Sequence, residues 1–193
     1  GGPCGGKSTA LCEIEEDLTK LRDKVFIIAE SATELMAGGF SPVSLKGFQN
    51  YLTKYQIEKE ELYEQAAREY GGKVVIVCDR GLLDNKAYMS ENQFQSVLKS
   101  VGLSEITARD NYGAVFQLVT TAKGAEEYYR NKDNKDSTNK FRSEDLDGAR
   151  KLDDRMINAW TGHPHFRVID NSTDFKTKIH RLLVEIRSYL GES

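Results

Sequence analysis

The chain has 193 residues, of which 39% are hydrophobic and 30% are charged, and its formal net charge is -3. This composition fits one soluble globular domain and excludes a disordered chain. The mildly acidic balance gives no general attraction to nucleic acid, so we expect no nucleic-acid partner and only local phosphate binding. No stretch approaches the roughly 20 apolar residues of a membrane span, so we expect no integral membrane segment. Cys4, Cys12 and Cys78 have unrelated spacings, which is typical of reduced thiols in a cytoplasmic protein.

The first part of the chain alternates between helical periodicity and short apolar runs. The continuous apolar runs at 25–29 and 74–78 predict strands buried in a parallel sheet. The intervening segments carry apolar residues at three- and four-residue steps, which indicates helices. We expect helices at 9–24, 31–36, 45–70 and 92–101, and a further turn at 104–109.

The second part of the chain continues the same alternation. We expect strands at 114–120 and 166–169, helices at 145–160 and 175–190, and a mobile polar loop at 131–140. The order predicts an α/β fold of the P-loop NTPase type, with a parallel sheet and helices on both faces. No linker interrupts it, so residues 1–193 are expected to form one kinase-like domain. Because such a loop normally follows a buried strand, we expect a short Val/Ile-rich strand before Gly1 in the complete protein.

The first eight residues match the phosphate-loop pattern G-x-x-x-x-G-K-[ST]. Glycines allow backbone N–H groups to converge on phosphate oxygens, and the helix that follows adds its positive end. Lys7 is expected to reach the β- and γ-phosphates, and the Ser8 hydroxyl is expected to bind magnesium. The alternative is a chance glycine-rich turn. The expected nucleotide-binding residues are Gly1, Gly2, Pro3, Cys4, Gly5, Gly6, Lys7, Ser8 and Thr9.

Asp79 and Arg80 directly follow the apolar run at 74–78. A carboxylate at the carboxyl end of a buried strand is where P-loop proteins hold magnesium or its water, so Asp79 is a candidate metal ligand. Arg80 is a candidate for binding a substrate carboxylate or phosphate with two hydrogen bonds. The alternatives are a helix N-cap or a partner for Arg80 in the case of Asp79, and a structural ion pair in the case of Arg80.

Glu30 ends the preceding apolar run, which is the corresponding position on the neighbouring strand. In a kinase a carboxylate at this position can accept the proton of an attacking hydroxyl, so Glu30 is a candidate catalytic base and substrate-binding residue. The alternative is a cap for the helix that begins at Ser31.

The segment at about 123–143 has the sequence position of a lid, between the third and fourth expected strands. Phosphoryl transfer needs cations that approach the developing negative charge. Arg142 is the first candidate for this catalytic role and Arg155 the second, and the alternative is that both are solvated helix charges.

Asn171 follows the fourth expected strand, in a loop that lies against the purine base in P-loop kinases. It is therefore a candidate nucleotide-binding residue. The alternative, which we favour for this loop, is that Ser172 or Thr173 caps the last helix.

Three further segments strengthen the interpretation: Glu-Ser-Ala-Thr-Glu-Leu at 30–35, Cys-Asp-Arg-Gly at 78–81, and the Gly-His-Pro-containing stretch at 162–172. Together with the phosphate loop, they resemble the AAA-type, kinase-like P-loop ATPase family grouped with the ribosylnicotinamide kinase domain of NAD metabolism and the TRPL translocation defect proteins. The resemblance covers nearly the whole chain and implies the fold of nucleoside and nucleotide kinases. In similar deoxynucleoside kinases a glutamate at the end of the second strand is the base, which supports Glu30.

Two functions follow as hypotheses. In the first, the protein binds ATP or GTP with magnesium and phosphorylates a small nucleoside-like acceptor. In the second, it is a nucleotide-dependent switch that binds a protein or a phosphoinositide in membrane trafficking. A kinase needs an intact base at Glu30, whereas a switch needs a surface that changes with the bound nucleotide.

Overall fold

A computed structural model describes residues 4–129 and 145–192 of the chain. Its elements fall into two compact units: unit 1 comprises residues 1–10 and 112–193, and unit 2 comprises residues 11–111. The helix α1 (Lys7–Leu18) begins in unit 1 and continues into unit 2. The expected single domain therefore remains a prediction, and each unit is described by itself.

Unit 2 is built on two parallel strands, β1 (Lys24–Ile28) and β2 (Val74–Cys78). Their register pairs Lys24 with Val74 and Ile28 with Cys78, and the Asp79 amide extends the ladder by donating to the Ile28 carbonyl at 2.9 Å. Because Ile28 pairs with Cys78, the residues that follow β1 and β2 lie at the same end of this strand pair. The helical elements of this unit are α2 (Ser31–Ala37), α3 (Phe48–Tyr70), the 3-10 helix η1 (Leu82–Tyr88), α4 (Glu91–Ser100) and α5 (Glu105–Asp110).

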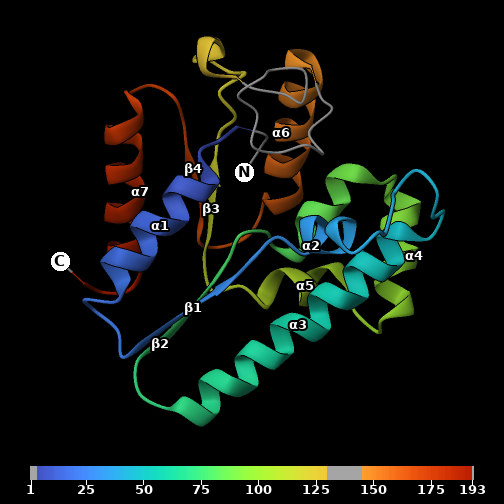
Figure 1. Cartoon of the computed structure of the whole chain (residues 1–193), viewed down its shortest axis with the longest axis horizontal. Helices are drawn as coiled ribbons and strands as arrows, with labels where there is room; N and C mark the ends of the chain where they lie inside the picture. Colours follow the sequence, from blue (N-terminus) through green and yellow to red (C-terminus); the bar gives the residue numbers. More distant parts are fainter. Residues whose placement is uncertain (1–3, 130–144, 193) are drawn as a thin grey trace. The chain divides into compact units, whose positions relative to one another are not determined.

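The long helix α3 packs along the β1–β2 pair, as Figure 1 shows. Phe26 of β1 and Tyr63 of α3 meet edge to face, with ring centroids 5.8 Å apart, a favourable arrangement for two aromatic rings. Leu83, Phe94 and Leu98, from η1 and α4, are fully buried. Apolar burial on these helices therefore holds the strand ends of unit 2 in place.

Unit 1 contains the other two parallel strands, β3 (Val115–Leu118) and β4 (Phe166–Ile169). They lie between α6 (Leu146–Trp160) and α7 (Phe175–Tyr189), as Figure 1 shows, and a short 3-10 helix, η2 (Glu126–Tyr128), follows β3. Met156, Trp160 and Leu182 bury the inner faces of the two helices. Helices on both sides of a parallel strand pair are the arrangement that the alternating pattern predicted for the whole sheet.

The predicted α/β class with parallel strands is confirmed, with some differences in detail. The described strands form two parallel pairs, and the residues of β2 are half-buried rather than buried. The helix expected at 9–24 ends at Leu18, and the helix expected from residue 45 begins only at Phe48, after Gly47. Among the described residues, no helix is both long and apolar enough to cross a bilayer.

The predicted cap of the last helix is wrong by one or two residues. Asp174, not Ser172 or Thr173, occupies the N-cap of α7, and its carboxylate accepts a hydrogen bond from the Thr177 amide at 3.1 Å. The Ser172 hydroxyl instead donates to Asp170 at 2.6 Å. A carboxylate suits this position because it satisfies a free amide of the first turn and is negative at the positive helix end.

Candidate functional site

The described part of the phosphate loop has the backbone shape of an anion-binding turn. Cys4 has a φ of 53° and Gly6 a φ of 86°, so two left-handed residues flank Gly5. Such alternation lets successive N–H groups point into one concavity. Gly6 also has no room for a side chain, since a Cβ there would overlap the Phe175 ring of α7. Gly1, Gly2 and Pro3 lie outside the described residues.

Lys7, Ser8 and Thr9 form the first turn of α1, and the Ala10 amide donates to the Gly6 carbonyl at 2.9 Å to close that turn. Lys7 is half-buried, and Ser8 and Thr9 are exposed. The free amides and the positive end of a 12-residue helix therefore lie at the phosphate loop. This local structure is the one that the sequence pattern predicts for a triphosphate site.

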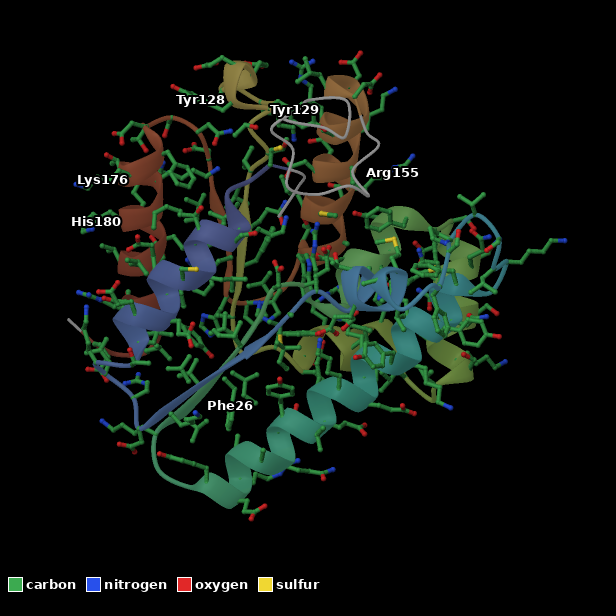
Figure 2. All side chains as sticks on the ribbon, in the orientation of Figure 1. Phe26, Tyr128, Tyr129, Arg155, Lys176 and His180 are labelled. Carbon is green, nitrogen blue, oxygen red and sulfur yellow. The ribbon has the colours of Figure 1, made fainter. Side chains whose placement is uncertain are left out.

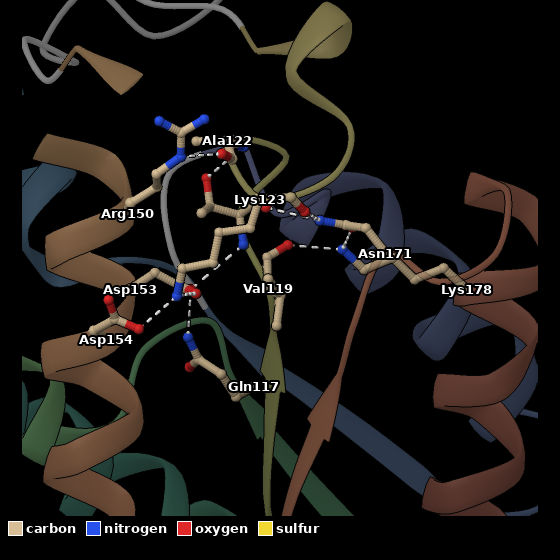
Figure 3. A network of polar contacts seen from close by, with 10 residues as sticks. Gln117, Val119, Ala122, Lys123, Arg150, Asp153, Asp154, Asn171 and Lys178 are labelled. Atoms are coloured by element: carbon tan, nitrogen blue, oxygen red, sulfur yellow. Dashed lines mark hydrogen bonds and ion pairs between the residues drawn. The ribbon is translucent and has the colours of Figure 1, made fainter. Parts of the chain in front are cut away.

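Asn171 occupies a junction between three segments of unit 1 (Figure 3). Its amide nitrogen donates to the Thr120 carbonyl at 2.8 Å and the Lys123 carbonyl at 2.7 Å, and its amide oxygen accepts from the Lys178 ammonium at 2.7 Å. Both N–H groups of the side chain are thus committed to backbone carbonyls. A contact of Asn171 with the nucleotide stays a prediction, and the side chain holds the loops after β3 and β4 together.

Asp153 of α6 is fully buried and forms a second group of polar contacts in unit 1, beside that of Asn171. One of its oxygens accepts from Gln117 at 2.9 Å and from the Thr120 amide at 3.4 Å, and the other accepts from Lys123 at 2.9 Å. Burial alone would lower the pKa of Lys123, but its hydrogen bonds to Asp154 and Asp153 raise it. Sequence reasoning missed Asp153. The available signal was an acid one residue after Leu152, on the inner side of the helix.

The arginines of α6 and of the expected lid segment have different surroundings. Arg150 donates to the Ala122 carbonyl at 2.6 Å and pairs with Glu126 at 3.1 Å, so it fastens the segment after β3 to α6. Arg155 is exposed on α6 (Figure 2). Arg142, and with it most of the segment expected to form a lid, lies outside the described residues. The lid and its catalytic cation therefore stay predictions.

In unit 2, Glu30 precedes α2 but does not use its side chain as a cap. Its carboxylate accepts from Arg80 Nε at 3.0 Å and from the Thr33 hydroxyl at 2.6 Å. The register of β1 and β2 explains the pairing, because it ends both strands at the same level. The side chain of Glu30 is 25% exposed, so the carboxylate is held in place while it still reaches solvent.

Arg80 forms the ion pair that the sequence left open as an alternative. Its guanidinium contacts Glu30 and, at 3.5 Å, the buried Asp84, and its side chain is only 13% exposed. Burial would lower the pKa of Arg80, but the nearby Tyr88, Asp84, Glu30 and Asp79 raise it above its ordinary value. The arginine is therefore a permanent cation beside the Glu30 carboxylate.

Two buried amides that sequence reasoning missed fix the backbone of Arg80. Gln56 of α3 donates to the Arg80 carbonyl at 3.1 Å, and Asn85 of η1 donates to the Gln56 side-chain oxygen at 3.1 Å. Both are nearly inaccessible, at 3% and 7% exposure. The sequence predicted a helix at 45–70, and only the fold shows that the polar Gln56 of this helix is buried.

Asp79 follows β2 directly, and its Oδ1 atom is buried and accepts no hydrogen bond from the described residues. A buried carboxylate oxygen without a donor costs free energy unless a ligand satisfies it, and a hard cation or its water would do so. The described residues contain no cluster of three or more His, Cys, Asp or Glu side chains for a metal. This donor set fits magnesium of the P-loop kind, in which waters and phosphates supply most ligands.

Comparison with known proteins identifies the family of the chain. A family model described as an AAA domain matches residues 1–178, which is most of the chain. A search of curated proteins finds no match. The matched range includes both the phosphate loop and the Glu30–Arg80 pair.

Proposed function

The chain belongs to the AAA domain family, and from this premise we propose that it transfers the γ-phosphoryl group of a magnesium–nucleotide, ATP or GTP, to a hydroxyl group of a small nucleoside-like acceptor. Family membership implies nucleotide binding. The reaction and its acceptor are the proposal, and the resemblance of the 30–35 and 78–81 segments to nucleoside kinases supports them.

The nucleotide is assigned to the phosphate loop. The loop amides and the N-terminal turn of α1 bind phosphate oxygens, and Lys7 neutralises charge on the β- and γ-phosphates. Ser8 and Asp79 are the residues that would hold magnesium, which supplies charge neutralisation at the transferred group. The unsatisfied Oδ1 of Asp79 supports this assignment.

The Glu30 carboxylate carries the kinase half of the proposal. A carboxylate that is fixed by two donors, partly solvent-accessible and not used as a helix cap is suited to a positioned base. Glu30 would take the proton of the acceptor hydroxyl while that oxygen bonds to the γ-phosphorus and the bond from phosphorus to the β–γ bridging oxygen breaks. Arg80 holds the carboxylate, and its cation favours an acceptor that carries negative or polar groups.

The test combines a ligand screen with one isosteric substitution. Thermal shift measurements cross ATP and GTP, each with magnesium, with a panel of nucleosides, because a ligand that binds the native state raises its melting temperature. With the acceptor found, the rates of ADP or GDP release and of product formation are measured together for wild type and Glu30→Gln. Loss of a general base lowers the rate about 10²–10⁴-fold, while nucleotide affinity stays unchanged.

The matched control is Glu34→Gln, one turn further along α2, where the carboxylate binds Lys59 and Tyr55. It removes the same charge without touching the Glu30–Arg80 pair and should retain turnover. Slow hydrolysis without a phosphorylated acceptor, unaffected by Glu30→Gln, would instead support the nucleotide-dependent switch and overturn the kinase proposal.

A further inference from the structure

Lys178 of α7 is a buried cation that the proposed reaction does not use. It is 2% exposed, and no other lysine among the described residues falls in the buried class. Fully buried lysines are rare because removing an ammonium from water is costly. A lysine retained at such a position needs compensating contacts, and the contacts of Lys178 all lie within unit 1.

The Lys178 ammonium donates to three oxygens on three different segments. They are the Gly5 carbonyl of the phosphate loop at 3.3 Å, the Val119 carbonyl after β3 at 2.8 Å, and the Asn171 side-chain oxygen after β4 at 2.7 Å. Figure 3 shows Lys178, Val119 and Asn171 together. One side chain therefore links the phosphate loop to the carboxyl ends of both strands of unit 1.

The bond to Gly5 also sets the direction of a phosphate-binding amide. In a planar trans peptide the C=O of one residue and the N–H of the next point in opposite directions. Because Lys178 holds the Gly5 carbonyl toward α7, the Gly6 N–H is directed to the opposite side of the loop. Gly6 has a φ of 86°, and a Cβ built at this position would overlap the Phe175 ring, so the peptide orientation shown here favours glycine.

We propose that Lys178 is a positioning residue for nucleotide binding: its ammonium fixes the Gly5–Gly6 peptide so that the Gly6 amide is preset for a phosphate oxygen. The inference rests on the proposed nucleotide site and adds to it a residue that never touches the ligand. Three acceptors need three donors, and only the protonated lysine supplies three N–H groups.

The protonation state of Lys178 changes within an accessible pH range. Burial lowers its pKa to about 8, against the opposing charges of Asp153 on α6 and Asp170 after β4, while Arg181 on α7 lowers it further. The neutral amine has only two N–H donors, so one of the three oxygens loses its partner above pH 8. Nucleotide affinity is therefore expected to fall as pH rises through that value.

As pH rises through 8, the contribution of Lys178 to the free energy of unfolding should increase while nucleotide affinity falls. These opposite changes distinguish a positioning role from a merely structural one. The ordinary pKa of 10.5 lies above the value in the fold, so between about pH 8 and 10.5 the unfolded chain binds more protons than the folded one. The contribution of Lys178 to the free energy of unfolding consequently rises with pH in this window, because the folded protein then buries a neutral amine instead of an ammonium ion. Affinity falls where stability from this group increases.

The experiment compares wild type, Lys178→Met and Lys176→Met. Lys176 lies on the same helix and is exposed (Figure 2), so its substitution removes a charge without touching the loop. Hydrogen exchange of the peptide 4–10 is measured without nucleotide, and affinity for magnesium–ATP and magnesium–GTP is measured from pH 7 to 9.5. We expect Lys178→Met to accelerate exchange at the loop, to weaken affinity about 10-fold at pH 7 and to abolish the fall above pH 8. Lys176→Met should follow wild type.

Equal loop exchange and equal affinity in Lys178→Met and wild type would overturn the inference. A nucleotide affinity of wild type that does not change across pH 8 would also overturn it. This measurement needs no variant, so it remains decisive even if Lys178→Met fails to fold. If the loop exchange depends on Lys178 but wild type binds neither nucleotide, the positioning of the loop is supported and the proposed function is the part that fails.

Discussion

Asp153 in unit 1 and Asp79 in unit 2 are both aspartates beside the end of a parallel strand, but their oxygens are used differently. Asp153 is fully buried, and both of its oxygens accept hydrogen bonds, from Gln117, the Thr120 amide and Lys123. Asp79 is half-buried, and its Oδ1 is enclosed without a hydrogen-bond partner among the described residues.

The difference separates a structural carboxylate from one available for a ligand. A buried carboxylate whose oxygens are all paired contributes to the fold, and removing its charge leaves the partners unsatisfied. A carboxylate with an unpaired buried oxygen reduces stability and is retained where a ligand uses that oxygen. The comparison therefore separates Asp153, whose contacts support the fold, from Asp79, for which metal binding is the proposal.

The largest expected effect concerns stability. Asp153→Asn takes one of two carboxylate partners from Lys123 and the charged acceptor from Gln117 and the Thr120 amide, and should lower the free energy of unfolding by about 3 kcal/mol. Asp79→Asn should change it little, because Asp79 Oδ1 accepts no hydrogen bond from the described residues and the substitution removes only the attraction of its charge to Arg80. Denaturant titration of both variants measures this. Equal destabilisation by the two substitutions would break the comparison.

The next effect concerns binding in unit 1, where Lys7 should behave opposite to Asp153. Lys7→Ala is expected to weaken nucleotide affinity about 100-fold, because a charge-assisted contact with phosphate is lost, and to leave the fold intact. Calorimetric titration with ATP and GTP measures the affinity. Lys20→Ala is a control, since Lys20 is an exposed lysine beyond the end of α1. Unchanged affinity for both nucleotides in Lys7→Ala would remove the phosphate loop from the proposed site.

The smallest effect concerns magnesium. Asp79→Asn should raise the magnesium concentration that half-saturates nucleotide binding about 10-fold, while affinity measured in EDTA stays as in wild type. A neutral amide oxygen is a weaker ligand for a hard cation or its water than a carboxylate oxygen. Magnesium titrations of mutant and wild type that coincide would show Asp79 to be structural, and the contrast with Asp153 would lose its functional meaning.

The local features of this protein could be predicted from sequence because short-range chemistry decides them. The run Val74–Cys78 predicts a strand with its bounds as observed, since a short run rich in β-branched residues and bounded by glycines and charged residues favours a strand over a helix. The phosphate-loop pattern likewise predicts the turn into α1, because its glycine and the following Lys-Ser require that backbone. The family match agrees with this interpretation.

The contacts of the site could not be predicted in the same way. Gln56 and Lys178 look like surface residues of polar helices, yet both are buried and bind backbone carbonyls far away in sequence. Helical spacing indicates which face is apolar, but it does not show that a polar residue near that face will meet an unpaired carbonyl of another segment. The N-cap of α7 was also predicted at the wrong residue. Ser172, Thr173 and Asp174 are all favourable N-cap residues, so residue type alone did not show which of them would begin the helix.

The sequence by itself determined the elements, the phosphate loop and the strand-end acids, because each depends on residues adjacent in the chain. Only the tertiary structure decided that Glu30 is held by Arg80 and that Lys178 binds the Gly5 carbonyl. It also decided that both Asp153 oxygens accept hydrogen bonds while Asp79 Oδ1 accepts none from the described residues. These outcomes depend on which donors and acceptors meet after the chain folds. A buried polar group is stable only with such a partner, and the partner here comes from 36 to 173 residues away.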